Sequence, residues 1–183
     1  MQPATASFLA HTDRFADTVR AVEAAGAWSA PSPCEGWSAA GVVDHVVDTQ
    51  RDFLAQRDVD LGARSGGGPA AVWDDHLDAV RLVVADDALV GATYDGYFGP
   101  TTMAETLRDF YGFDLHVHRW DLGRAADQDV AWDEAETDAV ERALDGFGDS
   151  LYLDGICRPA VDPPTGASRQ TRLLARTGRR AWA

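Results

Sequence analysis

The chain has 183 residues, enough for one domain with a sizeable hydrophobic core. Hydrophobic residues make up 45% and charged residues 25%, which is typical of globular and not of disordered chains. The formal net charge of −14 disfavours nucleic acid as a partner, and neither a run of ~18 apolar residues nor a signal peptide is present. We therefore expect one cytoplasmic domain over residues 1–183, with no nucleic acid and no membrane as its partner.

Three amphipathic helices are predicted first along the chain. Apolar residues recur at helical spacing over about 5–25, 39–56 and 70–87, and Ser38 is a good N-cap for the second helix. Residues 93–102, TYDGYFGPTT, carry Gly and Pro at a spacing that predicts a turn or a short extended excursion.

A fourth, longer helix is predicted from a cap at Thr101 or Thr102 to about Ala126. Further helices are predicted over 133–151 and 169–177, and between them GICRPAVDPPTG (155–166) must be irregular or briefly extended. The expected fold is all-α, a four-helix bundle with short extra helices and an irregular or briefly extended C-terminal excursion. The stripe of the fourth helix that should face the core contains Met103, Leu107, Phe110, Tyr111 and Leu122.

All 16 basic residues are arginines, and the segment 158–183 holds six of them against one acid, Asp162. We interpret this segment as a basic terminal helix docked on an acidic body, with an anion-binding tail as the alternative. Only two cysteines occur, Cys34 and Cys157, too few for a zinc framework. We interpret Cys34 as a small buried apolar residue, with a catalytic nucleophile as the alternative.

Two ionisable groups continue the apolar stripe of the fourth helix. Asp114 and His118 are spaced i, i+4 and so share one face, which is the spacing at which one helix can give two ligands to one ion. A buried carboxylate needs a cation, a set of hydrogen-bond donors or a metal, because an uncompensated one costs several kcal/mol. His116 lies ~200° away around the helix, on the face expected to be solvated, and is interpreted as a bystander.

A bundle site normally draws ligands from more than one helix. His45 lies at the edge of the valine-rich face of the second helix, where it is either a ligand or a hydrogen-bonded core histidine, whereas His11 and His76 are expected at the surface. The residues His45, Asp114 and His118 would leave open coordination positions. Such a set suits Zn²⁺ first, with Ni²⁺, Fe²⁺ and Mn²⁺ as alternatives.

Three segments resemble a known family when taken in order: PCEGWSAAGVVDHVVD (33–48), FDLHVHRWDLGRA (113–125) and TRLLARTGR (171–179). They are similar to the PC-x-GW-S/T…H, E-x-x-x-H-x-WDL-x-RA and RLLALLGR motifs of DinB-like bundles related to mycothiol-dependent maleylpyruvate isomerase. The similarity extends over almost the whole chain, and the lack of lysine fits an actinobacterial branch of that family.

The resemblance implies a DinB-like four-helix fold and a divalent metal held at the positions of His45, Asp114 and His118. Two departures matter. The usual glutamate is Asp114 here, one methylene shorter, so coordination would involve a helix shift or a water. The characterised isomerase also has a further C-terminal domain that helps form its active site. We expect no such domain here, and therefore a thiol-dependent S-transferase rather than maleylpyruvate isomerisation.

The expected function is that of a metal- and thiol-dependent transferase or isomerase acting on a small electrophile, with a mycothiol-type thiol as partner and a metal-bound water or thiol as the reactive group. Arg119 and Arg124 are candidates to hold an acidic group, and Trp120 and Asp121 to support the ligands, Asp121 by orienting an imidazole. The alternatives are a non-catalytic metal-binding module and a structural bundle, including one that forms a homodimer.

Overall fold

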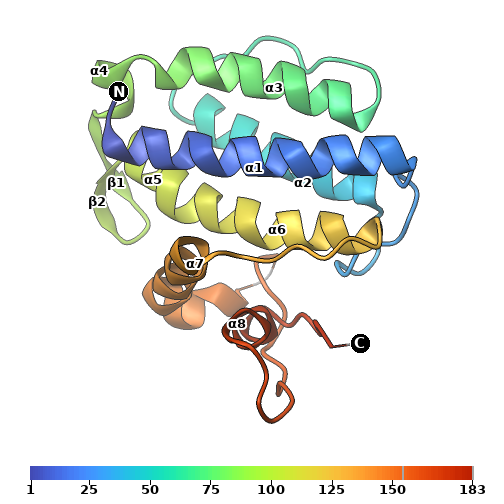
Figure 1. Ribbon diagram of the computed structural model, residues 1–183. Helices are drawn as coiled ribbons and strands as arrows, with labels where there is room; N and C mark the ends of the chain where they lie inside the picture. The colour runs from blue at the N-terminus through green and yellow to red at the C-terminus, as the bar shows by residue number, and fades with distance from the viewer. Residues whose placement is uncertain (154, 183) are drawn as a thin grey trace. The chain divides into compact units, whose positions relative to one another are not determined.

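The computed structural model describes residues 1–153 and 155–182. The described residues are mainly helical with one two-stranded sheet, which confirms the predicted all-α class (Figure 1). The chain divides into two compact units, residues 1–128 and 129–183, and each is described by itself. The single domain over 1–183 stays a prediction.

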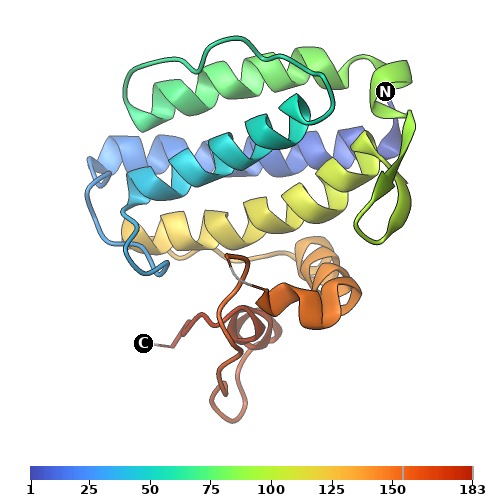
Figure 2. The ribbon, with the colours of Figure 1, turned by 180° about the vertical axis from the view of Figure 1, so that it is seen from behind.

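The first unit is a four-helix bundle, and Figures 1 and 2 show its long helices side by side. α1 (Pro3–Ala25) and α2 (Ala39–Ala55) each contact both α3 (Pro69–Val84) and α6 (Gly112–Ala125). Their apolar faces form one core, whose largest fully buried side chains include Trp73, Phe8, Phe15, Leu54 and Leu107. The site described below lies in this unit.

The N-terminal end of α2 is fixed by the predicted cap. The backbone N–H of Gly41 donates to the Ser38 hydroxyl, and Ser38 itself has extended backbone. A side-chain acceptor at this position satisfies one of the N–H groups that the first turn leaves without a helical partner. The cap therefore sets where α2 begins and hence which of its residues face α6.

The predicted turn of residues 93–102 is a β-hairpin. After the short helix α4 (Asp87–Val90), β1 (Thr93–Gly96) pairs antiparallel with β2 (Gly99–Thr102). Thr102 then caps α5 (Met103–Thr106) in a capping box with Glu105. It is one of the two N-cap residues, Thr101 or Thr102, that were predicted for the fourth helix.

The predicted fourth helix is continuous but not uniformly α-helical. Between α5 and α6, residues Leu107–Tyr111 (η1) form a π-helical turn with i→i+5 hydrogen bonding. This wider turn changes the angular spacing of the side chains. Phe110, predicted on the buried stripe, is 40% exposed, whereas Leu107 and Tyr111 are buried, so the prediction was wrong for Phe110.

The second unit contains α7 (Glu134–Phe147), a 3₁₀ turn η2 (Gly148–Tyr152) and α8 (Arg169–Arg176). α8 contacts α7, and the proline-rich segment 155–166 has neither helix nor strand, as predicted. Ala183, the last residue of the predicted basic tail, lies outside the described residues. Across residues 1–153 and 155–182, no helix combines the length and hydropathy needed to cross a bilayer.

Candidate metal centre

The structure brings the three predicted ligands together. His45 of α2 and His118 of α6 each direct Nε2 at Oδ1 of Asp114, at 3.6 Å and 3.3 Å. One ligand atom from each residue lies within 4.8 Å of the other two. Ligand atoms bound at ~2.1 Å to a tetrahedral ion lie about 3.4 Å from one another. The two distances from Asp114 to the imidazole nitrogens are close to this value.

Helix packing explains the convergence. The i, i+4 spacing puts Asp114 and His118 on one face of α6, and α6 contacts α2, which carries His45. The π-helical turn ends directly before Gly112 and sets the rotation of this face. Asp114 reaches both imidazoles directly in this arrangement, although its side chain is one methylene shorter than glutamate.

The cluster is partly open to solvent. Exposure of the side chain falls from 26% for His45 through 18% for Asp114 to 8% for His118. Within the described residues, Oδ2 of Asp114 is buried and accepts no hydrogen bond. A carboxylate oxygen in this situation is stabilised by a cation, so the donor set fits a divalent ion.

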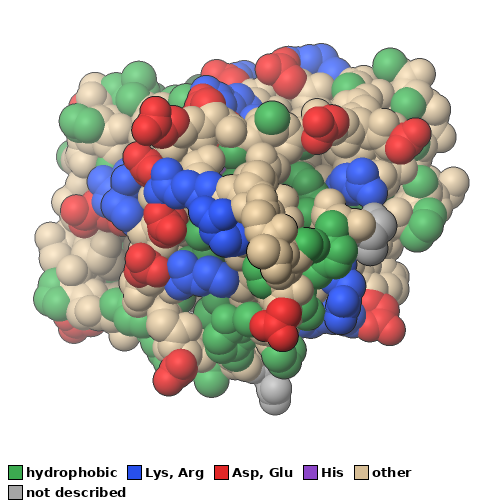
Figure 3. Space-filling model, turned by 60° about the horizontal axis from the view of Figure 1, so that its bottom comes forward, with side chains coloured by type: hydrophobic (Ala, Val, Ile, Leu, Met, Phe, Trp, Pro, Cys, Tyr) green, Lys and Arg blue, Asp and Glu red, His purple; other side chains and the backbone are tan. Residues whose placement is uncertain are grey.

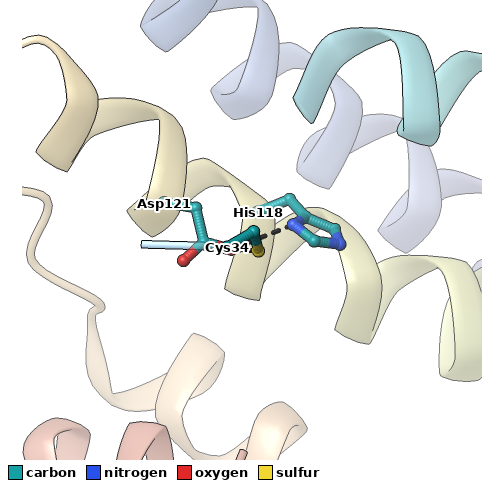
Figure 4. Close-up of side chains that lie close together, drawn as sticks. All are labelled: Cys34, His118 and Asp121. Carbon is teal, nitrogen blue, oxygen red and sulfur yellow. Dashed lines mark hydrogen bonds and ion pairs between the residues drawn. The ribbon is translucent and has the colours of Figure 1, made fainter. Parts of the chain in front are cut away.

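The other ring nitrogen of His118 faces Asp121. Nδ1 of His118 lies 2.9 Å from Oδ2 of Asp121, whose side chain is fully buried (Figure 4). Because a carboxylate only accepts hydrogen bonds, Nδ1 is the donor, and Nε2 is the nitrogen that faces Asp114 and His45. Asp121 makes the contact that its predicted role requires, and the role itself, orienting a metal-bound imidazole, stays a prediction.

Cys34 belongs to the same network and is not the buried apolar residue that was predicted. It is only partly buried, and its thiol donates to the oxygen of Asp121 that also accepts from His118, over 3.2 Å (Figure 4). Ligand atoms of Cys34, His118 and Asp121 lie within 4.8 Å of one another. The loop before α2 places the thiol there, and sequence spacing carries no signal for that contact.

Sequence reasoning also missed the role of Trp37. Its ring centroid lies 4.7 Å from that of His45 and 5.9 Å from that of His118, and the latter pair is stacked. Trp37 directly precedes the N-cap of α2, so the same turn that begins the helix lays the indole over both imidazoles. The two residues before α2, Trp37 and Ser38, thus position the site from outside the helices.

The charges of the cluster support one another. Burial would raise the pKa of Asp114, but the charge of His118 and hydrogen bonds to both histidines lower this pKa below its usual range. Burial would lower the pKa of His118, but Asp114, Asp121 and Cys34 together raise it well above its ordinary value. Without an ion, the pair is therefore an imidazolium and a carboxylate, and an incoming cation would displace the proton from Nε2.

The remaining histidines are placed differently from the predictions. His116 does not belong to the cluster, as predicted, but it is buried and not solvated, because its face of α6 packs on α1, with its ring 4.2 Å from that of His11. Gly112 makes room there, since a Cβ on it would lie 3.1 Å from the His11 ring. His76 is also buried, at 3% exposure, and bonds to Gln50, so its predicted surface position was wrong.

The other predicted candidates flank Asp121 on α6. Trp120 and Arg119 are buried, whereas Arg124 is exposed. Their contact with a substrate or a thiol stays a prediction.

Comparison with known families agrees with the motifs. The family model of the mycothiol maleylpyruvate isomerase N-terminal domain matches residues 8–173, nearly the whole chain. The chain therefore belongs to this family. No curated protein and no solved structure matches the chain.

Proposed function

We propose that this protein binds one divalent ion through His45, Asp114 and His118 and uses it to activate a low-molecular-weight thiol of the mycothiol type against a small electrophile. The observation that carries the proposal is the convergence of two imidazoles and one carboxylate from two helices, with ligand atoms within 4.8 Å of one another. Membership of a mycothiol-related family supports the thiol as the second component. Zn²⁺ is the preferred ion, with Ni²⁺, Fe²⁺ and Mn²⁺ as alternatives.

Each residue has a separate task in this proposal. His45 and His118 offer Nε2, and Asp114 offers the oxygen that lies between them. Asp121 holds the proton on Nδ1 of His118 and so keeps Nε2 available. Trp37 packs against both imidazoles, and His45 is the most exposed of the three ligands, so we expect the thiol to enter beside His45.

A bound divalent ion supplies Lewis acidity, which lowers the pKa of a thiol in an open coordination position. Around it the chain provides a mostly buried rim, where fewer waters compete with the thiol and ionic contacts are stronger than in bulk water. Arg119 and Arg124 remain the proposed partners of an acidic group on the thiol or on the electrophile.

The test uses Co²⁺ as a spectroscopic substitute for the native ion. The Co²⁺-loaded protein is titrated with a low-molecular-weight thiol, and the sulfur-to-metal charge-transfer absorption is recorded. We expect a new band that saturates with thiol in the wild-type protein. The Cys34→Ser variant should show the same band, because the sulfur comes from the added thiol and not from the neighbouring cysteine.

A second assay then distinguishes catalysis from binding: the rate at which the thiol is consumed by conjugation to a generic aryl halide is measured with and without metal. A metal-dependent increase in conjugation rate is expected, and His118→Ala should abolish it. If the charge-transfer band forms without any rate increase, the protein is a non-catalytic metal-binding module. If no thiol-dependent band forms at all in the Co²⁺ protein, the thiol part of the proposal is wrong.

A further inference from the structure

The second unit contains a groove beside α8. Its cavity volume is about 320 Å³, at the lower end of the range for small-molecule sites. One side is the proline-rich segment with Val161 and Pro163, and the other is α8 with Leu173. The space is therefore sized for a single ring or a short chain.

The walls of this α8 groove are held in place. The backbone N–H of Val161 donates to the carbonyl of Ala175 over 3.0 Å, which ties the proline-rich segment to the C-terminal end of α8. Gly178, with φ of 79°, packs so closely on this segment that a Cβ there would lie 2.5 Å from Cβ of Arg158. A groove fixed in this way loses little conformational freedom when a ligand enters it.

Three arginines of α8 line the groove, at i, i+3 and i+7 on one helix face: Arg169, Arg172 and Arg176. Two of them are neutralised by α7. Arg169 pairs with Asp138 at 2.7 Å and also with Glu141, which is the acidic residue that lines the groove, and Arg176 pairs with Asp145 at 2.8 Å. Figure 3 shows arginine side chains gathered beside acidic ones, with hydrophobic side chains between them.

Arg172 differs from its two neighbours. Nη1 of Arg172 donates to the carbonyl of Ala167, which orients the guanidinium, but within the described residues it forms no ion pair with a carboxylate. A guanidinium has five N–H donors, so most of them remain available at the groove. The groove thus combines an apolar lining with one uncompensated and oriented positive charge.

We propose that the α8 groove binds a small carboxylate-bearing molecule with an apolar body, and that Arg172 pairs with its carboxylate. The planar fork of arginine matches a carboxylate, and the apolar lining suits a ring or an alkyl chain. A more highly charged ligand is less suited, because the carboxylates that neutralise Arg169 and Arg176 stand close by. The proposal does not depend on the metal centre.

The experiment is an amide NMR titration of the full chain with benzoate and hexanoate. Benzamide serves as the uncharged match for benzoate. We expect the carboxylates to shift amide signals of α8 and of residues 160–162, and benzamide to shift them far less. Arg172→Gln should weaken benzoate binding about tenfold, the loss expected for one charge-assisted contact at a partly exposed site.

Two further variants make the result specific. Arg172→Lys keeps the charge without the fork and should bind with intermediate affinity. Arg142→Gln removes an exposed arginine of α7 that does not line the groove, and it should leave binding unchanged. The proposal is overturned if neither carboxylate shifts the α8 signals, if benzamide binds as well as benzoate, or if Arg142→Gln weakens binding as much as Arg172→Gln.

Discussion

At the scale of single residues, Asp121 has the most consequential contact outside the three proposed ligands. Its carboxylate is fully buried and one oxygen accepts from both His118 and Cys34. A substitution that removes the charge of Asp121 but keeps the shape of its side chain should therefore weaken the hydrogen bond to Nδ1 of His118 without opening a cavity.

We predict that Asp121→Asn lowers metal affinity by about 10- to 100-fold, the usual effect of losing the hydrogen-bond partner of a metal-bound histidine. Competition against a chromophoric chelator measures this affinity, and circular dichroism checks the fold. Cys34→Ser is the matched control, because it keeps the bond between His118 and Asp121 and should cost much less. Equal affinities for wild type and Asp121→Asn would contradict the role assigned to Asp121.

His76 provides a second prediction at this scale. Burial, aided by the charges of Arg51 and Arg64, lowers its pKa to about 4. Unfolded protein has a histidine pKa near ~6.5, so between these values the unfolded state takes up a proton that the folded state does not. The stability due to neutral His76 is thus fully present above about pH 6.5 and is lost as the pH falls toward about 4.

The free energy of unfolding should consequently drop by about 2 kcal/mol, from this residue alone, between about pH 7 and pH 4.5. Urea titrations at the two pH values measure it. In His76→Gln, which keeps an amide able to bond to Gln50 but cannot titrate, the drop should be smaller by that amount. An equally large drop in the variant would show that other groups cause it.

At the scale of elements, Thr102 controls the start of the helical segment that carries the site. Its hydroxyl accepts from the backbone of Glu105 at 3.2 Å, and the Glu105 carboxylate accepts from Thr102 in return. We predict that Thr102→Ala costs about 1 kcal/mol of unfolding free energy, whereas Thr102→Ser, which retains the acceptor, costs little. Chemical denaturation of both variants decides this, and a loss of equal size in Thr102→Ser would point to the methyl group instead of the cap.

The helices themselves could be predicted because their information is local. Ser38 as a cap, the apolar spacing of α1 to α3 and the prolines after η2 act over a few residues. The i, i+4 relation of Asp114 and His118 is equally local, and the valine-rich face of α2 made His45 the third candidate before the motif resemblance implied the same three positions. Helical spacing therefore indicated all three residues, although it left His45 open as a ligand or as a hydrogen-bonded core histidine.

What could not be predicted depends on packing between elements. A π-helical turn has no simple sequence pattern, so Phe110 was placed in the core although the turn exposes it. His116 and His76 were assigned to solvent because helical periodicity does not say how many sides of a helix are covered. The contacts of Cys34 and Trp37 join a loop to α6 and α2, and only the folded chain brings them together.

At the scale of the whole molecule, we expect metal to be part of the protein's native state. An ion that binds the folded chain and not the unfolded one stabilises it by mass action, so a chelator should lower the melting temperature of the wild-type protein. The apo site retains an ion pair between Asp114 and His118, which explains why we expect the bundle to stay folded after the metal is removed.

The most direct test is elemental analysis of protein purified without a metal-chelating column, together with His45→Ala and His118→Ala variants. We predict about one divalent ion per wild-type chain, and little or none in either variant, with circular dichroism showing the same helical content in all three. A wild-type protein without bound metal, or the same metal content in both variants as in the wild type, would contradict it.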